Sequence, residues 1–229
     1  MSATVVSPYA TDHTPAIRSG FREKLLADIP IVFVIHEDAP VREWLRKLMD
    51  SQGWRPEICA AAEGLLASER AAVPNCLVLD GSLSERNSFD LQKHLASERP
   101  EMPIIFIADQ VDVPTTVKAM KAGAVEFFTK PYQENLVLNS VREALEGSRL
   151  AIAKGAEMRT LRESYALLTT RERQVMALVV SGLLNKQVGS ELGISEITVK
   201  AHRGQVMQKM NAGSLADLVK KSEKLRLAA

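Results

Sequence analysis

Cysteines and long apolar stretches are scarce in this sequence. Cys59 and Cys76 are the only two cysteines among 229 residues, too few for a disulfide framework, so we expect a reducing compartment. No run of about 18 uncharged apolar residues occurs, and we expect no transmembrane helix. Residues 1–30 lack an apolar segment behind a basic start, which argues against a secretory signal. Together these absences predict a cytoplasmic protein that does not enter a membrane.

Recognisable reaction chemistry is also missing. We find no paired nucleophile and base, no cluster of metal ligands and no glycine-rich phosphate loop, so we expect no enzyme activity. The chain is 46% apolar and 25% charged, a composition typical of a folded globular protein. Its length fits one large domain or two ordinary ones.

The net charge of +1 is unevenly distributed. Residues 169–229 hold ten Lys and Arg against five Asp and Glu, a charge of +5. The rest of the chain holds 19 basic and 23 acidic residues, a charge of −4. An acidic front and a basic tail indicate that only the tail faces a polyanion.

Residues 31–146 alternate short apolar runs with amphipathic stretches. The apolar runs predict strands at 31–35, 56–59, 76–79, 104–107 and 125–128, and the amphipathic stretches predict helices at 40–51, 61–72, 88–98, 114–122 and 133–148. Five such units in a row predict a parallel sheet covered by helices on both faces. Ligand chemistry in such a sheet lies beyond the carboxyl ends of the strands.

The chain divides into four predicted segments. We expect an extension at 1–29, a first domain at 30–146, a helical linker at 147–166 and a second domain at 167–229. Apolar spacing from 134 to about 167 predicts one long helix, continuous or broken near Gly147 or Gly155, because glycine weakens a helix. A semi-rigid linker and a solvated connector without a signalling role are equally good interpretations.

The second domain has the pattern of four helices. Residues 169–172 (TTRE) form a capping box that opens the first, and Gly182 is placed to stop it. The second spans about 185–192, the third runs from its cap Ser195 to about 210, and the fourth follows Ser214. Two short helices joined by the glycine-containing turn at 192–195 are the signature of a helix-turn-helix.

Residues 31–146 resemble a response-regulator receiver domain. The matching residues are Asp80 after the third strand, PVR at 40–42, DVP at 112–114, AMKAGA at 119–124 and KP at 130–131. The resemblance implies a flavodoxin-like α/β fold, with a five-stranded parallel sheet in the order 2-1-3-4-5, and a cis peptide bond before Pro131. In this family the aspartate accepts a phosphoryl group, assisted by Mg²⁺ on carboxylates, a lysine and a hydroxyl.

Part of that phosphorylation pocket is altered. Asp80 and Lys130 stand at the acceptor and lysine positions, but the acidic pair expected after the first strand reads His36 and Glu37. Ala108 stands at the hydroxyl position and cannot bond a phosphoryl oxygen. With only Glu37 and Asp80 left as carboxylate ligands, Mg²⁺ binding should be weak or absent, because imidazole is a poor ligand for this cation.

The altered pocket leaves three interpretations. We favour a degenerate receiver that signals without efficient Mg²⁺-dependent phosphorylation. The first alternative is a conventional two-component regulator, phosphorylated on Asp80 by a histidine kinase or a small phosphodonor. The second is a docking module, controlled by another signalling protein or a small molecule at the altered pocket.

Residues 166–222 resemble the LuxR/FixJ-type DNA-binding domain. The matching segments are LTTRERQV at 168–175, GLLNKQV at 182–188 and ISEITVKAHR at 194–203. The resemblance implies an all-α four-helix domain that binds double-stranded DNA with its third helix in the major groove. Lys200 would donate to guanine or phosphate, and Ala201 would touch a thymine methyl. Gly204 either lets the backbone approach a base edge or is a tolerated surface glycine.

Other residues are expected to contact the DNA backbone. Such contacts fix the register of the protein on the duplex without reading sequence. By resemblance they are Thr198, His202, Arg203, Lys209, Asn185 and Lys186. The resemblance also implies a homodimer on inverted half-sites. The fourth helix would form its contact through Leu215, Leu218 or Val219, although inward packing is the simpler role for at least two of them.

Overall fold

The computed structural model describes residues 29–59, 65, 72–82 and 85–227. Nearly all of the expected extension and most of the helix expected at 61–72 lie outside these ranges. The chain divides into two compact units, with the boundary between Ile152 and Ala153. Within the described ranges, no helix is both long and apolar enough to cross a bilayer.

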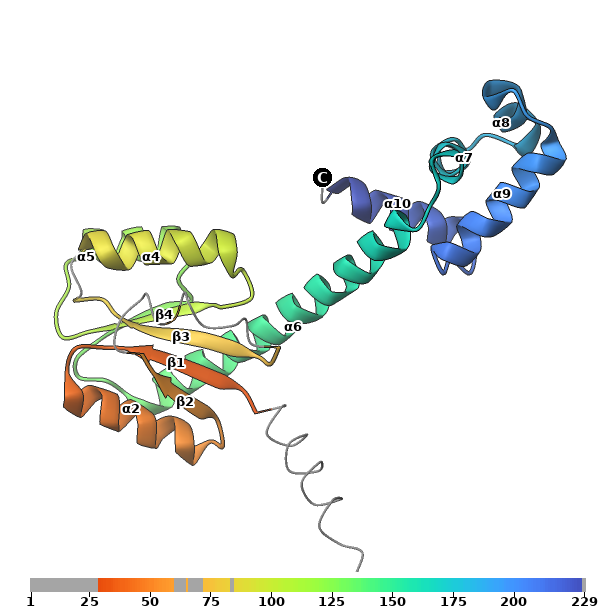
Figure 1. Cartoon of the computed structure of the whole chain (residues 1–229). Helices are drawn as coiled ribbons and strands as arrows, with labels where there is room; N and C mark the ends of the chain where they lie inside the picture. The colour runs from red at the N-terminus through yellow and green to blue at the C-terminus, as the bar shows by residue number, and fades with distance from the viewer. Residues whose placement is uncertain (1–28, 60–64, 66–71, 83–84, 228–229) are drawn as a thin grey trace, which may run out of the picture. The chain divides into compact units, whose positions relative to one another are not determined.

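Five parallel strands form the sheet of the first unit. They are β1 (Ile31–Ile35), β2 (Arg55–Ile58), β3 (Asn75–Asp80), β4 (Ile104–Ala108) and β5 (Glu126–Thr129). Their order is β2-β1-β3-β4-β5 (Figure 1), which confirms the expected topology. β1, β3 and β4 are buried along their whole length, because strands covered on both faces need apolar side chains in both directions.

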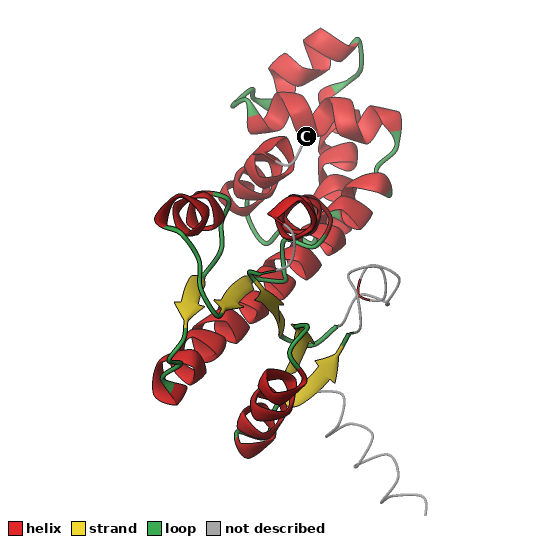
Figure 2. Cartoon of the chain, turned by 90° about the vertical axis from the view of Figure 1, so that its left-hand side faces the viewer, coloured by secondary structure: helices red, strands yellow, loops and turns green. Residues whose placement is uncertain are grey.

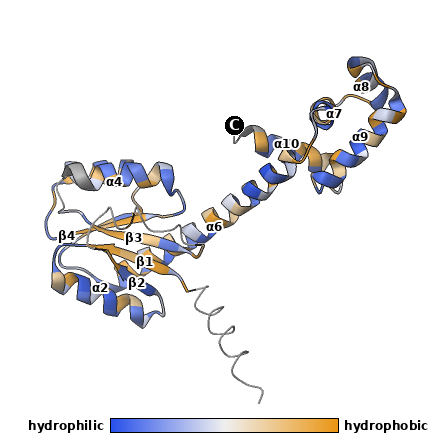
Figure 3. Cartoon of the chain, viewed as in Figure 1, coloured by the Kyte–Doolittle hydropathy of each residue, from blue (hydrophilic) through white to orange (hydrophobic). Residues whose placement is uncertain are grey.

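Helices cover both faces of the sheet (Figures 1 and 2). One core packs α2 (Ala39–Ser51) and the start of α6 (Glu134–Ala166) against one set of strand side chains, among them Val32 and Val78. The other packs α4 (Glu85–Glu98) and α5 (Val113–Lys121) against the alternate set, among them Phe33 and Leu77. Figure 3 shows the apolar strands between helices with polar outer faces. This packing fixes the strand ends where the pocket lies.

Helix α6 is continuous over 33 residues. Neither Gly147 nor Gly155 breaks it, although each costs roughly 1 kcal/mol against alanine. Val141 and Leu145 are buried in the first core, and the backbone N–H of Asn75 donates to Oγ of the fully buried Ser148 at 2.9 Å. These contacts hold the helix on both sides of Gly147.

The second unit contains α7 (Thr170–Val180), α8 (Asn185–Leu192), α9 (Glu196–Lys209) and α10 (Leu215–Leu227). The capping box is confirmed: the Glu172 N–H donates to Thr169 Oγ1, and the Thr169 N–H donates to Glu172 Oε2. Ser195 caps α9 by accepting from the Thr198 N–H, and Gly193 ends α8 with a φ of 65°. In α10, Leu218 is buried and Leu215 is partly exposed.

Candidate functional site

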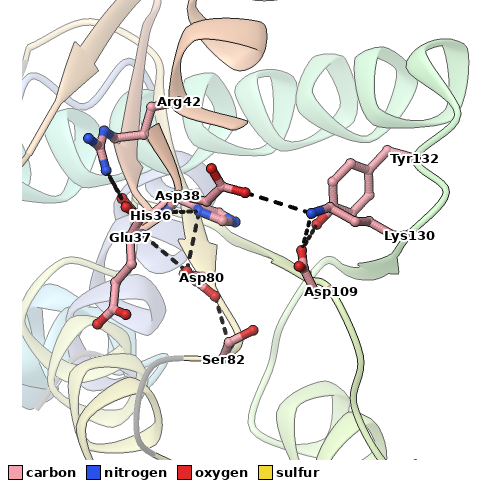
Figure 4. A network of polar contacts seen from close by, with 9 residues as sticks. All are labelled: His36, Glu37, Asp38, Arg42, Asp80, Ser82, Asp109, Lys130 and Tyr132. Carbon is pink, nitrogen blue, oxygen red and sulfur yellow. Dashed lines mark hydrogen bonds and ion pairs between the residues drawn. The ribbon is translucent and has the colours of Figure 1, made fainter. Parts of the chain in front are cut away.

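The carboxyl ends of the strands bring the expected pocket residues together. Asp80 ends β3, His36 and Glu37 follow β1, Ala108 ends β4, and Lys130 follows β5. A cis peptide bond joins Lys130 to Pro131. Figure 4 shows His36, Glu37, Asp80 and Lys130 from close by. The polar groups nevertheless form two sets of contacts, one around Asp80 and one around Lys130, with Asp38 in contact with both.

Asp80 is already surrounded by partners. It is 3% exposed, and its Oδ1 accepts from the Ser82 N–H at 2.7 Å. Its Oδ2 accepts from the Glu37 N–H at 3.1 Å and lies 3.3 Å from His36 Nδ1. Both carboxylate oxygens are therefore engaged by the chain itself, and the histidine occupies the position where an acidic residue was expected.

His36 is buried, and its Nδ1 atom has two polar neighbours. Nδ1 accepts from the Asp38 N–H at 3.1 Å and also faces the Asp80 carboxylate. One nitrogen carries either a lone pair or a proton, so it serves one of these two neighbours at a time. Nε2 has no hydrogen-bond partner among the described residues. The pocket thus holds an imidazole in place of the negative charge that would attract a cation.

Arg42 holds the loop that carries His36. Its Nη1 donates to the carbonyl oxygens of His36 and Glu37, each at 2.7 Å. Arg42 lies in the first turn of α2, whose entry at Pro40 suits the first turn of a helix. Helix α2 therefore fixes the direction in which the His36 side chain leaves the backbone.

Lys130 pairs with carboxylates other than Asp80. Its Nζ lies 2.5 Å from Asp109 Oδ1 and 3.7 Å from Asp38 Oδ2; among the described residues, no ion pair joins it to Asp80. Tyr132 also donates to Asp109 through its hydroxyl, at 3.3 Å. The hydrogen bond to Asp109 raises the pKa of Lys130, and the same bond lowers the pKa of Asp109. Asp109 therefore holds the lysine that a phosphoryl group would need.

Phe127 packs beside the residues that replace the usual pocket chemistry. Its ring stacks on Phe106 with centroids 5.4 Å apart. A Cβ added at Gly81 would lie 2.7 Å from Phe127 Cζ and 3.3 Å from the Cβ of Ala108. The ring thus occupies space that exists only because position 81 has no side chain, which supports a core role for Phe127.

The donor set does not fit a divalent cation. Glu37 is exposed, and Figure 4 shows its carboxylate directed away from Asp80. Within the described ranges, no three His, Cys, Asp or Glu side chains are grouped as metal ligands. A hard cation such as Mg²⁺ requires several oxygen ligands at about 2 Å, so the pocket as it stands offers too few.

The helix-turn-helix is closed by a tight approach of two backbones. A Cβ added at Gly189 in α8 would lie 2.7 Å from the Ile194 carbonyl oxygen, so only glycine fits there without a shift. Val188 and Val199 are fully buried in the small core that joins α8 to α9. The turn therefore fixes the angle at which α9 is presented.

Helix α9 has one buried face and one exposed face. Val199 and Val206 are buried, while the opposite face is exposed. Its members recur at three- and four-residue spacing, as one face of an α-helix does: Ile197, Lys200, Ala201, Gly204, Gln205 and Gln208. The three residues expected to contact bases, at 200, 201 and 204, all lie on this face. A Cβ at Gly204 would meet nothing within 4 Å.

Two residues expected to bind phosphate lie together across α8 and α9. Arg203 Nη1 donates to Asn185 Oδ1 at 3.1 Å, and Lys186 beside them is exposed. Thr198 Oγ1 lies 2.8 Å from the capping hydroxyl of Ser195. His202 is half-buried on α9. These groups lie near the starts of α8 and α9, or on the side of α9 next to its exposed face.

Lys209 is placed differently from the other expected phosphate contacts. Its Nζ donates to both carboxylate oxygens of Glu172, at 2.9 and 2.7 Å, and Glu172 is 4% exposed. The hydrogen bond from Lys209 lowers the pKa of Glu172. A phosphate contact would compete with this pairing of a buried carboxylate, which makes Lys209 the least favoured of the expected DNA contacts.

Comparisons with known proteins match both units. Residues 32–142 match the family model described as response regulator receiver domain, and residues 166–222 match that described as bacterial regulatory proteins, luxR family. Nodulation protein W of Bradyrhizobium diazoefficiens is 43% identical over 87% of this chain and 88% of its own length. The transcriptional regulatory protein FixJ of Rhizobium meliloti is 34% identical over 82% and 93%.

The chain belongs to the two-component response regulators with a LuxR-type DNA-binding domain. A solved structure described as the response regulator StyR has a TM-score of 0.75 and 41% identity, covering 86% of this chain and 99% of that one. As a response regulator of this family, the protein is a transcriptional regulator, and DNA and a histidine kinase are the partners that membership implies. Both resemblances inferred from the sequence are thereby confirmed.

Among the residues of this response regulator that sequence reasoning missed, Asp109 and Ile197 bear most on its function. Asp109 follows β4 and captures Lys130, which follows the neighbouring strand β5. The signal was available, because adjacent strands end side by side at one edge. Ile197 lies on the exposed face of α9, and its spacing from Lys200, Ala201 and Gly204 would have placed it there.

Proposed function

We propose that this response regulator reads DNA through the exposed face of α9 and is governed by a receiver that takes up phosphate inefficiently. Inefficient phosphorylation is supported by one observation: the pocket residues already pair with one another. His36 lies against Asp80, and Asp109 holds Lys130. An incoming phosphoryl group would have to displace both arrangements, without the hydroxyl that Ala108 lacks. Preorganised counter-charges are what such a transfer needs.

On the DNA, Lys200, Ala201 and Gly204 would face base edges. This proposal is supported by their common exposed face on α9 and by the width of the major groove, which admits an α-helix. The residues proposed to hold the backbone are Asn185, Lys186, Thr198, His202 and Arg203. The surplus of positive charge in this part of the chain supports the same assignment.

We further propose a homodimer on inverted half-sites, located in the cytoplasm and without a catalytic reaction of its own. The partly exposed Leu215 of α10 is available for a dimer contact, whereas the buried Leu218 is not. Val219 is half-buried. Inverted half-sites follow from two-fold symmetry, with centres about one helical turn of DNA apart.

The experiment is an intact-mass measurement after incubation with acetyl phosphate and Mg²⁺. We expect little acyl phosphate on the wild type. Stoichiometric modification that disappears in Asp80→Asn would favour a conventional two-component regulator. The presence of Asp80 and Lys130 at the acceptor and lysine positions favours this alternative. A thermal shift caused by a small molecule or a co-purified protein, independent of Mg²⁺, would favour a docking module at the pocket.

A further inference from the structure

We infer that Ile197 is a sequence-reading residue of α9, whose side chain contacts the 5-methyl group of a thymine in the major groove. The inference rests on the proposed DNA-reading face and names a residue and a base group within it. Lys200, Ala201 and Gly204 were singled out by family resemblance, whereas Ile197 is singled out by its exposure, its position and its chemistry.

The exposure of Ile197 is the first observation. Its side chain is 82% exposed, the largest fraction among the large apolar side chains of the described ranges. A single apolar residue on a protein surface means little by itself. Ile197, however, lies in the first turn of α9, and the N-terminal residues of a recognition helix are the ones that approach base edges.

The position of Ile197 on the helix is the second observation. Ala201 and Gly204 lie four and seven residues further on, directly along the same face. Ile197 therefore lies on the midline of the exposed face of α9 and not at its margin. We call this exposed face the stripe. From 197 to 204 the helix rises about 10 Å, which is close to the roughly 12 Å width of the major groove.

The shape and chemistry of the stripe select the ligand. Ala201 and Gly204 offer almost no side chain, so beside Ile197 the backbone can approach the base edges closely. Lys200 is the charged donor on this part of the stripe, and it suits guanine or phosphate. An aliphatic side chain offers no hydrogen bond, and the thymine methyl is the one apolar group that base pairs present in the major groove.

The test removes the methyl group from the DNA and the side chain from the protein, separately and together. Duplexes are first selected from a random library with the full chain. Each thymine of the selected site is then replaced by deoxyuridine, which lacks only the methyl group. Kd is measured by fluorescence anisotropy at one fixed salt concentration for the wild type, Ile197→Ala, Ala201→Gly and, as a matched exposed apolar control, Leu150→Ala, which lies on α6 and is 64% exposed.

The expected result is a coupling specific to one residue and one base. At one thymine per half-site, loss of the methyl should weaken wild-type binding about fourfold, the value of one buried methyl-sized group. The same replacement should leave Ile197→Ala unchanged, while Leu150→Ala behaves as the wild type. Additive effects of the two changes, a selected site without a methyl-sensitive thymine, or coupling to Ala201→Gly instead would overturn the inference.

This design separates two failures. If the full chain selects no duplex at all, the proposed DNA-reading function fails, and the role of Ile197 fails with it. If duplexes are selected and their thymine methyls are not coupled to Ile197, only the role of Ile197 is lost. The high exposure of Ile197 in the free protein means that its truncation leaves no cavity in the fold.

Discussion

Lys130 Nζ and Asp109 Oδ1 lie 2.5 Å apart, across the ends of the adjacent strands β5 and β4. The pair holds the lysine at the rim of the pocket, with Asp38 as its second carboxylate. A lysine with two carboxylate neighbours is already neutralised, so it offers little field to an approaching phosphate. Asp109 is therefore the residue whose replacement should most directly release Lys130 for an incoming phosphoryl group.

Replacing Asp109 by glycine should free Lys130. We expect the initial rate of acyl-phosphate formation from acetyl phosphate to rise between about threefold and tenfold, since 1.4 kcal/mol of barrier corresponds to tenfold in rate. Intact-mass measurements over time give the rate. The matched control is Asp90→Ala, which removes an exposed carboxylate of α4. Equal rates in both variants would show that Asp109 does not restrain the lysine.

Replacing His36 by aspartate should restore a carboxylate beside Asp80. We expect phosphorylation to become dependent on Mg²⁺ and faster than in the wild type, because a hard cation gains an oxygen ligand and the imidazole is removed. Phosphorylation is followed over a Mg²⁺ titration, with His94→Asp on the exposed surface of α4 as control. A His36→Asp protein that stays indifferent to Mg²⁺ would contradict this account of the pocket.

Replacing Lys200 by alanine should weaken binding to the selected duplex more than binding to a random one. A donor to a base edge contributes about 1–3 kcal/mol of discrimination, whereas a phosphate contact weakens both complexes alike. Competition binding with the two duplexes measures the ratio. An unchanged ratio together with weaker overall binding would reassign Lys200 to the DNA backbone.

The salt dependence of binding should separate true phosphate contacts from Lys209. Each of Lys186→Ala and Arg203→Ala should reduce the slope of log K against log salt by about 0.9. Lys209→Met should leave the slope unchanged, because that ammonium group is held by Glu172. Titrations at four or more salt concentrations give the slopes. A reduced slope in Lys209→Met would return Lys209 to the DNA interface.

The Glu172–Lys209 pair should make the second unit sensitive to acid. The pKa of Glu172 lies below its ordinary value of 4.5 because Lys209 donates to it, so the stability from this pair is complete above that value and is lost as the pH falls through the folded pKa. Glu172→Gln should cost about 2 kcal/mol at neutral pH. The same substitution should also make the free energy of unfolding of the second unit less dependent on pH in the acid range. Hydrogen exchange of α7 and α9 amides reports this unit directly.

Much of the fold could be predicted from the sequence because local and global signals agree in it. The apolar runs of β1, β3 and β4 are buried on both faces, and the caps at Thr169 and Ser195 begin helices where their hydrogen-bonding chemistry requires. The continuity of α6 remained open because glycine propensity alone could not be weighed against packing, which here includes the buried Ser148.

The site could be predicted only in part. Motif positions located Asp80 and Lys130, yet the partner of Lys130 depends on side-chain directions at two strand ends, which a linear motif does not contain. The surroundings of Lys209 could not be predicted for a related reason: a basic residue on a recognition helix resembles a phosphate ligand. The residue that it contacts in the structure, Glu172, is 37 residues away in the chain and comes close only when α7 packs on α9.

The contact between Gly81 and Phe127 has a wider consequence. A methyl group at position 81 would overlap the Phe127 ring. The present orientation of that ring therefore depends on glycine at position 81. An alanine at position 81 would require the Phe127 ring to shift from the place where it stacks on Phe106. Gly81, which directly follows Asp80, is thereby constrained by the packing of the core and not only by its place in the pocket.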